Sequence, residues 1–211
     1  MKYQLRDYQK KASDAAVMCF KMKSGRNGLL VLPTGAGKSL IIADIAARLE
    51  EPLIVFQPNK EILEQNFAKL QTYGIWDCSI YSASVGRKEI SRITFATIGS
   101  VIRHMKDFQH FKNILIDECH LVKPSDGMYK RFFEQAERRI VGLTATPYRL
   151  YSCMNGSMLK FLTRTRPRVF SQVLYYCQVS ELLAKGFLSR LKYYDVTRID
   201  LTKVRRNSSG A

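Results

Sequence analysis

Short apolar runs recur along the chain, and they are unbroken rather than alternating with polar residues. A strand that is buried on both faces of a sheet has this pattern, whereas a strand with one solvated face alternates. The runs occupy residues 28–32, 52–56, 78–82, 92–96, 113–117 and 139–144. The pattern therefore predicts a parallel sheet that is covered on both faces.

Helical patterns lie between these runs. Residues 39–49 follow a glycine turn directly, and residues 59–71 form a second amphipathic segment with Asn59 at the N-cap position. The apolar stripe of the second segment consists of Ile62, Leu63, Phe67 and Leu70. Because strands and helices alternate, we expect an α/β fold with a mainly parallel central sheet and crossover connections.

The pattern weakens after Pro147. Residues 148–170 mix apolar and basic side chains without a clear period, and a helix-like piece (179–187) and a strand-like piece (191–196) follow. A chain of 211 residues is long enough for one α/β domain with a proper core. We expect residues 1–195 to form this domain, and residues 196–211 to be a polar, basic tail or the start of a linker.

The net charge of +16 is the compositional feature that bears on function. It favours a polyanionic partner, nucleic acid first, although solubility or a basic face that contacts another domain would also account for it. Residues 160–211 hold 11 basic and 3 acidic side chains, which gives +8. This segment either contacts nucleic acid or forms a surface for a further domain.

The cysteines and the apolar runs exclude several classes of protein. The five cysteines are scattered and form no CxxC pair, which argues against a disulfide framework or a structural zinc site and for the reducing cytoplasm. The N-terminus has no apolar signal region, and no run approaches the roughly 18 residues of a membrane span. We therefore expect no membrane partner.

The stretch "PTGAGKS" has the order strand, glycine turn, helix. Successive backbone N–H groups in such a loop bind phosphate, and glycines let the backbone approach closely. Lys38 would neutralise the β- and γ-phosphates of ATP, and Ser39 would ligate Mg²⁺. A glycine turn with a chance Lys-Ser is the alternative, although the flanking strand and helix disfavour it. The candidate phosphate-binding residues are Pro33, Thr34, Gly35, Ala36, Gly37, Lys38 and Ser39.

Acids and hydroxyls follow two further strands. Asp117 would hold Mg²⁺, and Glu118 would act as general base on the attacking water. Thr144 and Thr146 could bond His120 or Glu118 through their hydroxyls. Taken alone, the first group could be solvated acids at a strand end, and Thr-Ala-Thr-Pro could be a strand end with a proline stop.

The N-terminal segment "QLRDYQKKA" offers groups that suit adenine. Gln9 carries the donor and acceptor needed to read adenine N7 and N6, and the flat guanidinium of Arg6 could stack on the base. Taken alone, this segment is only the start of an amphipathic helix.

The motifs occur in a recognisable order. The segments "LRDYQ", "PTGAGKS", "FQPNKEILEQN", "TFATIGSV", "DECH" and "TATP" resemble the Q motif and motifs I, Ia, Ib, II and III of superfamily 2 helicases. That family accepts a non-glycine residue where Leu32 stands, at the position of the first glycine of the commoner phosphate loop. The forms of three motifs are similar to those of the RadD-type repair helicases, the XPB-like helicases and the type III restriction-enzyme motor subunits, with RadD-like as the nearest match.

The resemblance covers residues 3–149 and implies an ATP-dependent motor on nucleic acid with a RecA-like P-loop NTPase fold in three layers. DNA is favoured as the nucleic acid, and RNA is the alternative. The resemblance also implies that Arg6 and Gln9 bind adenine and that Lys38, Asp117 and Glu118 serve hydrolysis. His120, Thr144 and Thr146 would couple hydrolysis to movement. The residues that would touch the phosphates of the nucleic-acid strand are Gln57, Pro58, Asn59, Thr97 and Ser100. Helix capping is the alternative role for these five residues.

Motors of this family have a second RecA-like domain that carries an arginine finger in a QxxGRxxR motif. Nothing in the chain matches that motif, because "EQAERRI" (134–140) lacks its spacing and glycine. We therefore expect this chain to hold the first motor domain only. The alternatives are a nucleotide-gated binding module and the motor part of a restriction complex with its nuclease elsewhere. A small-molecule P-loop kinase explains the motifs less well.

Overall fold

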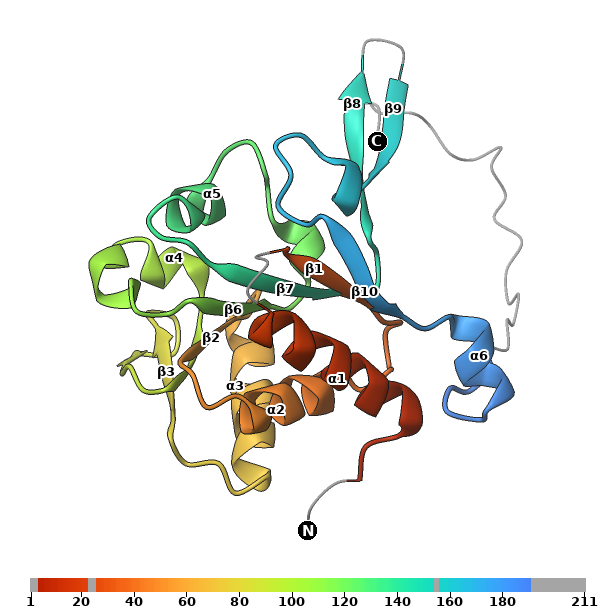
Figure 1. Ribbon diagram of the computed structural model, residues 1–211, viewed down its shortest axis with the longest axis horizontal. Helices are drawn as coiled ribbons and strands as arrows, with labels where there is room; N and C mark the ends of the chain where they lie inside the picture. Colours follow the sequence, from red (N-terminus) through yellow and green to blue (C-terminus); the bar gives the residue numbers. More distant parts are fainter. Residues whose placement is uncertain (1–3, 23–25, 154–155, 191–211) are drawn as a thin grey trace, which may run out of the picture.

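The computed structural model describes residues 4–22, 26–153 and 156–190 (Figure 1). Within these residues an eight-stranded sheet has the order β10-β1-β7-β6-β2-β5-β3-β4, and only the β3–β4 pair is antiparallel. The strands are β1 (Gly28–Val31), β2 (Leu53–Phe56), β3 (Cys78–Ser82), β4 (Arg87–Lys88), β5 (Ile93–Ala96), β6 (Asn113–Ile116), β7 (Arg139–Thr144) and β10 (Gln172–Tyr176). The six apolar runs are six of these strands, so the predicted mainly parallel sheet is confirmed.

Helices cover both faces of the sheet (Figure 1). On one face lie α1 (Asp7–Lys21), α2 (Lys38–Arg48) and α3 (Lys60–Thr72), and on the other lie α4 (Ile98–Val101), the 3-10 turn η1 (Met105–Phe108) and α5 (Met128–Phe133). Leu30 packs in the first layer and its neighbour Leu29 in the second, and both are fully buried. The expected three-layer sandwich is confirmed, and it explains why the runs do not alternate.

The parallel strands place their carboxyl ends at one edge of the sheet, which is where ligands bind in open α/β folds. Backbone bonds continue each ladder beyond the strand end. The N–H of Leu32 donates to the Thr144 carbonyl at 2.9 Å, and that of Asp117 donates to the Phe56 carbonyl at 3.0 Å. The predicted phosphate loop, the acidic turn and the Thr-Ala-Thr-Pro segment therefore meet at this edge.

The part after Pro147 contains a projecting hairpin that the sequence pattern did not predict (Figure 1). It consists of β8 (Tyr148–Cys153) and β9 (Gly156–Phe161), and the 3-10 turn η3 (Leu162–Arg164) follows. Cross-strand pairing puts Tyr148 opposite Phe161 and Leu150 opposite Leu159 on one face, and each of these four side chains is at least 39% exposed. Apolar side chains of these two strands face solvent rather than a core, so the rule of burial predicted no element in residues 148–170.

The rest of the described chain ends in β10, beside β1, and in α6 (Val179–Ala184), which lies inside the predicted helix 179–187. The strand-like piece 191–196, the boundary at residue 195 and the tail 196–211 lie outside the described residues. In the described parts of the chain, no helix combines the length and the apolar run needed to cross a bilayer.

Candidate nucleotide and nucleic-acid sites

The loop between β1 and α2 has the backbone of a phosphate cradle. Gly35 and Gly37 have φ angles of 81° and 76°, which side-chain-bearing residues rarely adopt. Gly37 is also the N-cap of α2, and its carbonyl accepts from the Leu40 N–H at 3.0 Å. No side chain caps the helix, so the N–H groups of Lys38 and Ser39 at its start can bind an anion. A Cβ added to Gly37 would lie 2.5 Å from Gln9 Nε2. This backbone fits a bound phosphate group.

Helix α1 holds this loop from behind. The Tyr8 hydroxyl and Gln9 Nε2 both donate to the Ala36 carbonyl, at 2.9 and 3.0 Å, and Gln9 Oε1 accepts from the Arg6 N–H at 2.9 Å. Gln9 is 3% exposed. Both ends of its amide therefore have protein partners, while each could still form one more bond. Its role in reading adenine stays a prediction. Tyr8 was not singled out from the sequence.

The acidic turn after β6 lies directly against the loop. Lys38 Nζ and Glu118 Oε1 are 2.6 Å apart, and both side chains are largely buried. Glu118 has φ 48° and is the one non-glycine residue with a positive φ in the described ranges. Such a backbone costs about 1–3 kcal/mol and gathers at functional sites. The turn thus places a carboxylate on the phosphate-loop lysine.

Asp117 is buried behind this ion pair. It is 5% exposed, its Oδ1 accepts from the Glu118 N–H at 3.0 Å, and its Oδ2 accepts from Asn66 Nδ2 at 3.2 Å. Burial raises the pKa of Asp117 to about 6, against the opposing effect of the Lys38 charge. The sequence analysis missed Asn66, although a polar residue on the apolar face of helix 59–71 was a usable signal.

A series of polar contacts connects Glu118 with the Thr-Ala-Thr-Pro segment. His120 Nδ1 lies 3.3 Å from Glu118 Oε2 and 3.0 Å from Thr144 Oγ1. Since a carboxylate only accepts, Nδ1 carries the proton when it bonds Glu118. Thr144 Oγ1 in turn accepts from the Thr146 N–H at 3.0 Å. The hydroxyl of Thr144 lies within hydrogen-bond distance of His120, as expected. Thr146 contacts Thr144 through its backbone N–H.

The residues expected to hold Mg²⁺ are Ser39, half-buried in the first turn of α2, and Asp117. A hydroxyl and a carboxylate are hard oxygen donors of the kind that Mg²⁺ prefers when phosphates and water complete its shell. Across the described residues there is no cluster of three or more His, Cys, Asp or Glu side chains that could hold a metal alone. The residues present fit a magnesium ion that arrives with a nucleotide.

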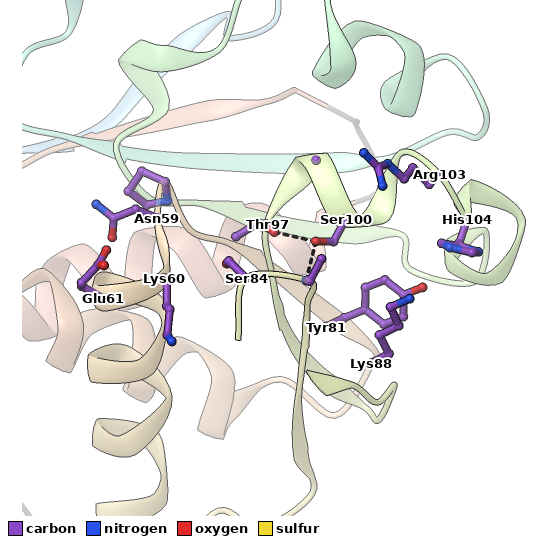
Figure 2. A pocket seen from close by; sticks show the side chains of 13 residues that line it. Asn59, Lys60, Glu61, Tyr81, Ser84, Lys88, Thr97, Ser100, Arg103 and His104 are labelled. Atoms are coloured by element: carbon purple, nitrogen blue, oxygen red, sulfur yellow. Dashed lines mark hydrogen bonds between the residues drawn. The ribbon is translucent and has the colours of Figure 1, made fainter. Parts of the chain in front are cut away.

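A second site lies at the carboxyl ends of β2, β3 and β5. A pocket of about 610 Å³ lies there, and the hydroxyls of Thr97 and Ser100 in it are 2.9 Å apart. Figure 2 draws this hydrogen bond as a dashed line. The Ser100 hydroxyl also accepts from the Ala83 N–H at 2.9 Å. Asn59 lines the same pocket, and its Oδ1 accepts from the Ile62 N–H at 2.9 Å, so the predicted N-cap of α3 is confirmed.

The three cations of this pocket were not singled out from the sequence, although the first of them stands inside the segment "FQPNKEILEQN". They are Lys60, Lys88 and Arg103 (Figure 2). The neighbouring pocket of about 480 Å³ is lined by Gln57 and Pro58. Gln57 is 1% exposed, and neither polar atom of its amide has a partner among the described residues. A buried amide without partners costs about 1–3 kcal/mol, which a ligand could recover.

Comparison with known proteins adds a family to this geometry. Residues 2–149 match the family described as "Type III restriction enzyme, res subunit". The DNA 3'-5' translocase XPB2 of Sulfurisphaera tokodaii is 29% identical over 151 residues, which are 70% of this chain and 32% of that protein. The DNA 3'-5' helicase XPB of Mycobacterium tuberculosis is 29% identical over 154 residues, which are 68% and 27% respectively. The chain thus spans a third or less of the length of these two relatives.

Solved structures share the fold. A nuclease-deletion mutant of the Type ISP restriction-modification enzyme LlaGI, in complex with a DNA substrate mimic, has a TM-score of 0.63 at 16% identity and covers 88% of this chain and 21% of its own. The UvsW helicase from Bacteriophage T4 has a TM-score of 0.55 at 22% identity, with coverages of 69% and 54%. The family match spans most of the chain, which therefore belongs to the type III restriction enzyme res-subunit family and has the fold of the first motor domain of a superfamily 2 helicase.

Proposed function

We propose that this chain is the nucleotide-binding first motor domain of an ATP-dependent DNA helicase or translocase, which hydrolyses ATP when a second RecA-like domain completes it. The observation that carries the proposal is the contact of Lys38 with Glu118 at 2.6 Å, beside a glycine cradle at a helix N-terminus. A cation, a carboxylate and the start of a helix thus lie together at the sheet edge. Phosphoryl transfer to water needs these groups.

Each residue then has a role of its own. The loop N–H groups and Lys38 bind the phosphates, and Ser39 with Asp117 holds the metal. When Mg²⁺-ATP is bound, it supplies the phosphoryl group and the metal charge that stabilises the leaving group. Glu118 exchanges its contact with Lys38 for the attacking water and accepts its proton. His120 and Thr144 keep the carboxylate of Glu118 oriented through the contacts described above.

The second site supports nucleic acid as the partner. Its pocket has hydroxyls and three cations against one carboxylate, that of Glu61, and the neighbouring pocket has an amide without partners. These groups suit contacts to phosphates, which hold a strand without reading its sequence. The net charge of +16 acts in the same direction. We favour DNA over RNA because the two relatives described above are named for DNA.

The resemblance to RadD-type helicases extends the proposal to DNA repair. A reducing cytoplasm is supported by the cysteines, because Cys19, Cys78, Cys119 and Cys177 are free in the described chain.

The test is ATP hydrolysis with single-stranded DNA, duplex DNA or single-stranded RNA, measured for this chain and for a polypeptide that also carries a second motor domain. An arginine finger contributes about 10³–10⁵ in rate, so we expect stimulation only in the longer protein. Glu118→Gln should abolish hydrolysis and keep nucleotide binding, whereas Lys38→Ala should weaken both. Brisk DNA-stimulated hydrolysis by the short chain would contradict the two-domain requirement. If neither protein responds to any polymer while nucleotide still binds, a nucleotide-gated binding module is the better description.

A further inference from the structure

The segment Gly186–Leu188, just after α6, lies against both the start of α1 and the phosphate loop. Helix α6 ends in a left-handed residue, Gly186, with φ 68°. The N–H groups of Phe187 and Leu188 both donate to the Leu182 carbonyl, at 2.8 and 3.3 Å. This helix ending fixes the direction of the two side chains that follow it.

Phe187 contacts the N-terminal motif. The guanidinium carbon of Arg6 lies 4.1 Å from the centre of the Phe187 ring, and the Tyr8 ring lies 5.8 Å from it between centroids. Leu188 reaches the phosphate loop, since a Cβ built on Gly35 would be 2.9 Å from Leu188 Cδ2. Phe187 therefore packs on Arg6, which is expected to contact the base, and its neighbour Leu188 packs on the loop that is expected to bind the phosphates.

These contacts affect how a base can be held. A guanidinium is flat and has two faces, and in this structure one of them covers Phe187. Gln9 is buried and both ends of its amide are engaged within the protein. Arg6 is exposed, so stacking on its outer face is the base contact that the geometry offers most directly.

We propose that Phe187 is a positioning residue of the nucleotide site: it holds the Arg6 guanidinium in the plane on which a purine base stacks. This inference rests on the proposed binding of ATP. It adds to the site a residue from the carboxyl-terminal end of the described chain, 181 positions after Arg6. The contact with the phosphate loop is made by a different side chain, Leu188, so the support of Arg6 by Phe187 can be tested separately from phosphate binding.

The experiment is calorimetric titration of the chain with ATP and, separately, with inorganic tripolyphosphate, which has the phosphates but no base. Phe187→Leu keeps apolar bulk and removes the ring. We expect its affinity for ATP to fall about 3- to 10-fold, as for the loss of a partly exposed cation–π contact, with tripolyphosphate affinity unchanged. Phe187→Tyr should restore ATP binding, and Arg6→Ala combined with Phe187→Leu should be no weaker than Arg6→Ala alone.

Phe161→Leu is the matched control, because this phenylalanine is exposed on the hairpin and is expected to leave both affinities unchanged. Equal losses for ATP and tripolyphosphate in Phe187→Leu would show that Phe187 only stabilises the loop, and would overturn the inference. Unchanged ATP affinity in that variant would overturn it as well, while leaving the proposed function standing. A wild-type chain that binds neither ligand, with no difference from Lys38→Ala, would overturn both.

Discussion

Replacing Gly142 by Ala tests the packing between the acidic turn and the strand before Thr-Ala-Thr-Pro. Gly142 lies in the middle of β7 and pairs with Leu29 of β1 and Ile116 of β6, so ladders on both sides prevent its backbone from moving. An added Cβ would lie 2.6 Å from Cys119 Sγ, 2.8 Å from Cys119 Cβ and 2.8 Å from Phe170 Cε1. Cys119 stands between Glu118 and His120, so the strain acts on the acidic turn itself.

The expected loss of stability in Gly142→Ala follows from overpacking of the core. Inserting one carbon into a filled core costs about 1–3 kcal/mol, and three contacts under 3 Å favour the upper half of that range. Ala has less conformational freedom than Gly in the unfolded chain, which offsets about 0.4–1 kcal/mol of this loss of stability. The net loss of about 1–2.6 kcal/mol corresponds to a melting temperature about 2–10 °C lower for a domain of this size. Thermal unfolding followed by circular dichroism measures this directly.

Gly99→Ala is the control, because a Cβ on Gly99 of α4 has nothing within 4 Å and its φ is not positive. We expect a melting temperature that is unchanged or slightly raised by the helix preference of Ala. Adding Cys119→Ala to Gly142→Ala should recover part of the loss, since one of the three clashing atoms disappears. A change below about 1 °C in Gly142→Ala, with Gly99→Ala equally neutral, would refute the described packing of Cys119 on β7.

Three further predictions concern single side chains. Asn59→Ala should lower the melting temperature by about 2–4 °C through loss of the α3 cap, and Asn59→Ser should restore most of it; equal values for the two would contradict the capping role. Leu150→Ser should change the free energy of unfolding, measured in urea, by less than about 0.5 kcal/mol, because this side chain is 72% exposed; a larger loss would show that the hairpin face is covered. Tyr8→Phe should destabilise the chain by about 1 kcal/mol in the same assay and weaken ATP binding, because the Ala36 carbonyl loses a buried donor; unchanged stability would contradict that bond.

The sheet could be predicted from sequence because a strand that is buried on both faces has an unbroken run of apolar residues. Each strand between two helical layers is apolar at every position, and the fully buried Leu29 and Leu30 show both faces of one strand. The N-cap at Asn59 was predicted for an equally local reason. The hairpin β8–β9 was missed because its apolar face is towards solvent, and no rule of burial identifies such strands.

The site was predicted only where its chemistry is contiguous. Lys38 and Glu118 stand in short motifs, and their contact follows once strand order is known. Asn66 and Phe187 act through contacts across 51 and 181 positions of chain, with Asp117 and with Arg6, and neither belongs to a motif. Which helix face meets which strand end depends on packing in three dimensions, and a single sequence does not contain that information in local form.

The contacts at the sheet edge also connect the acidic turn to the hairpin. Arg149 of β8 donates to the Val122 carbonyl at 2.7 Å, and Val122 directly follows the 3-10 turn η2 (Cys119–Leu121). At the other end of the hairpin, the Leu162 N–H donates to the Pro147 carbonyl at 2.8 Å. The first bond joins the acidic turn to β8, and the second closes the base of the hairpin between its own two strands, so a movement of the turn would reach the hairpin through Arg149. The exposed apolar face of β8 and β9 is thus connected, through Arg149 and Val122, to the turn that carries Glu118.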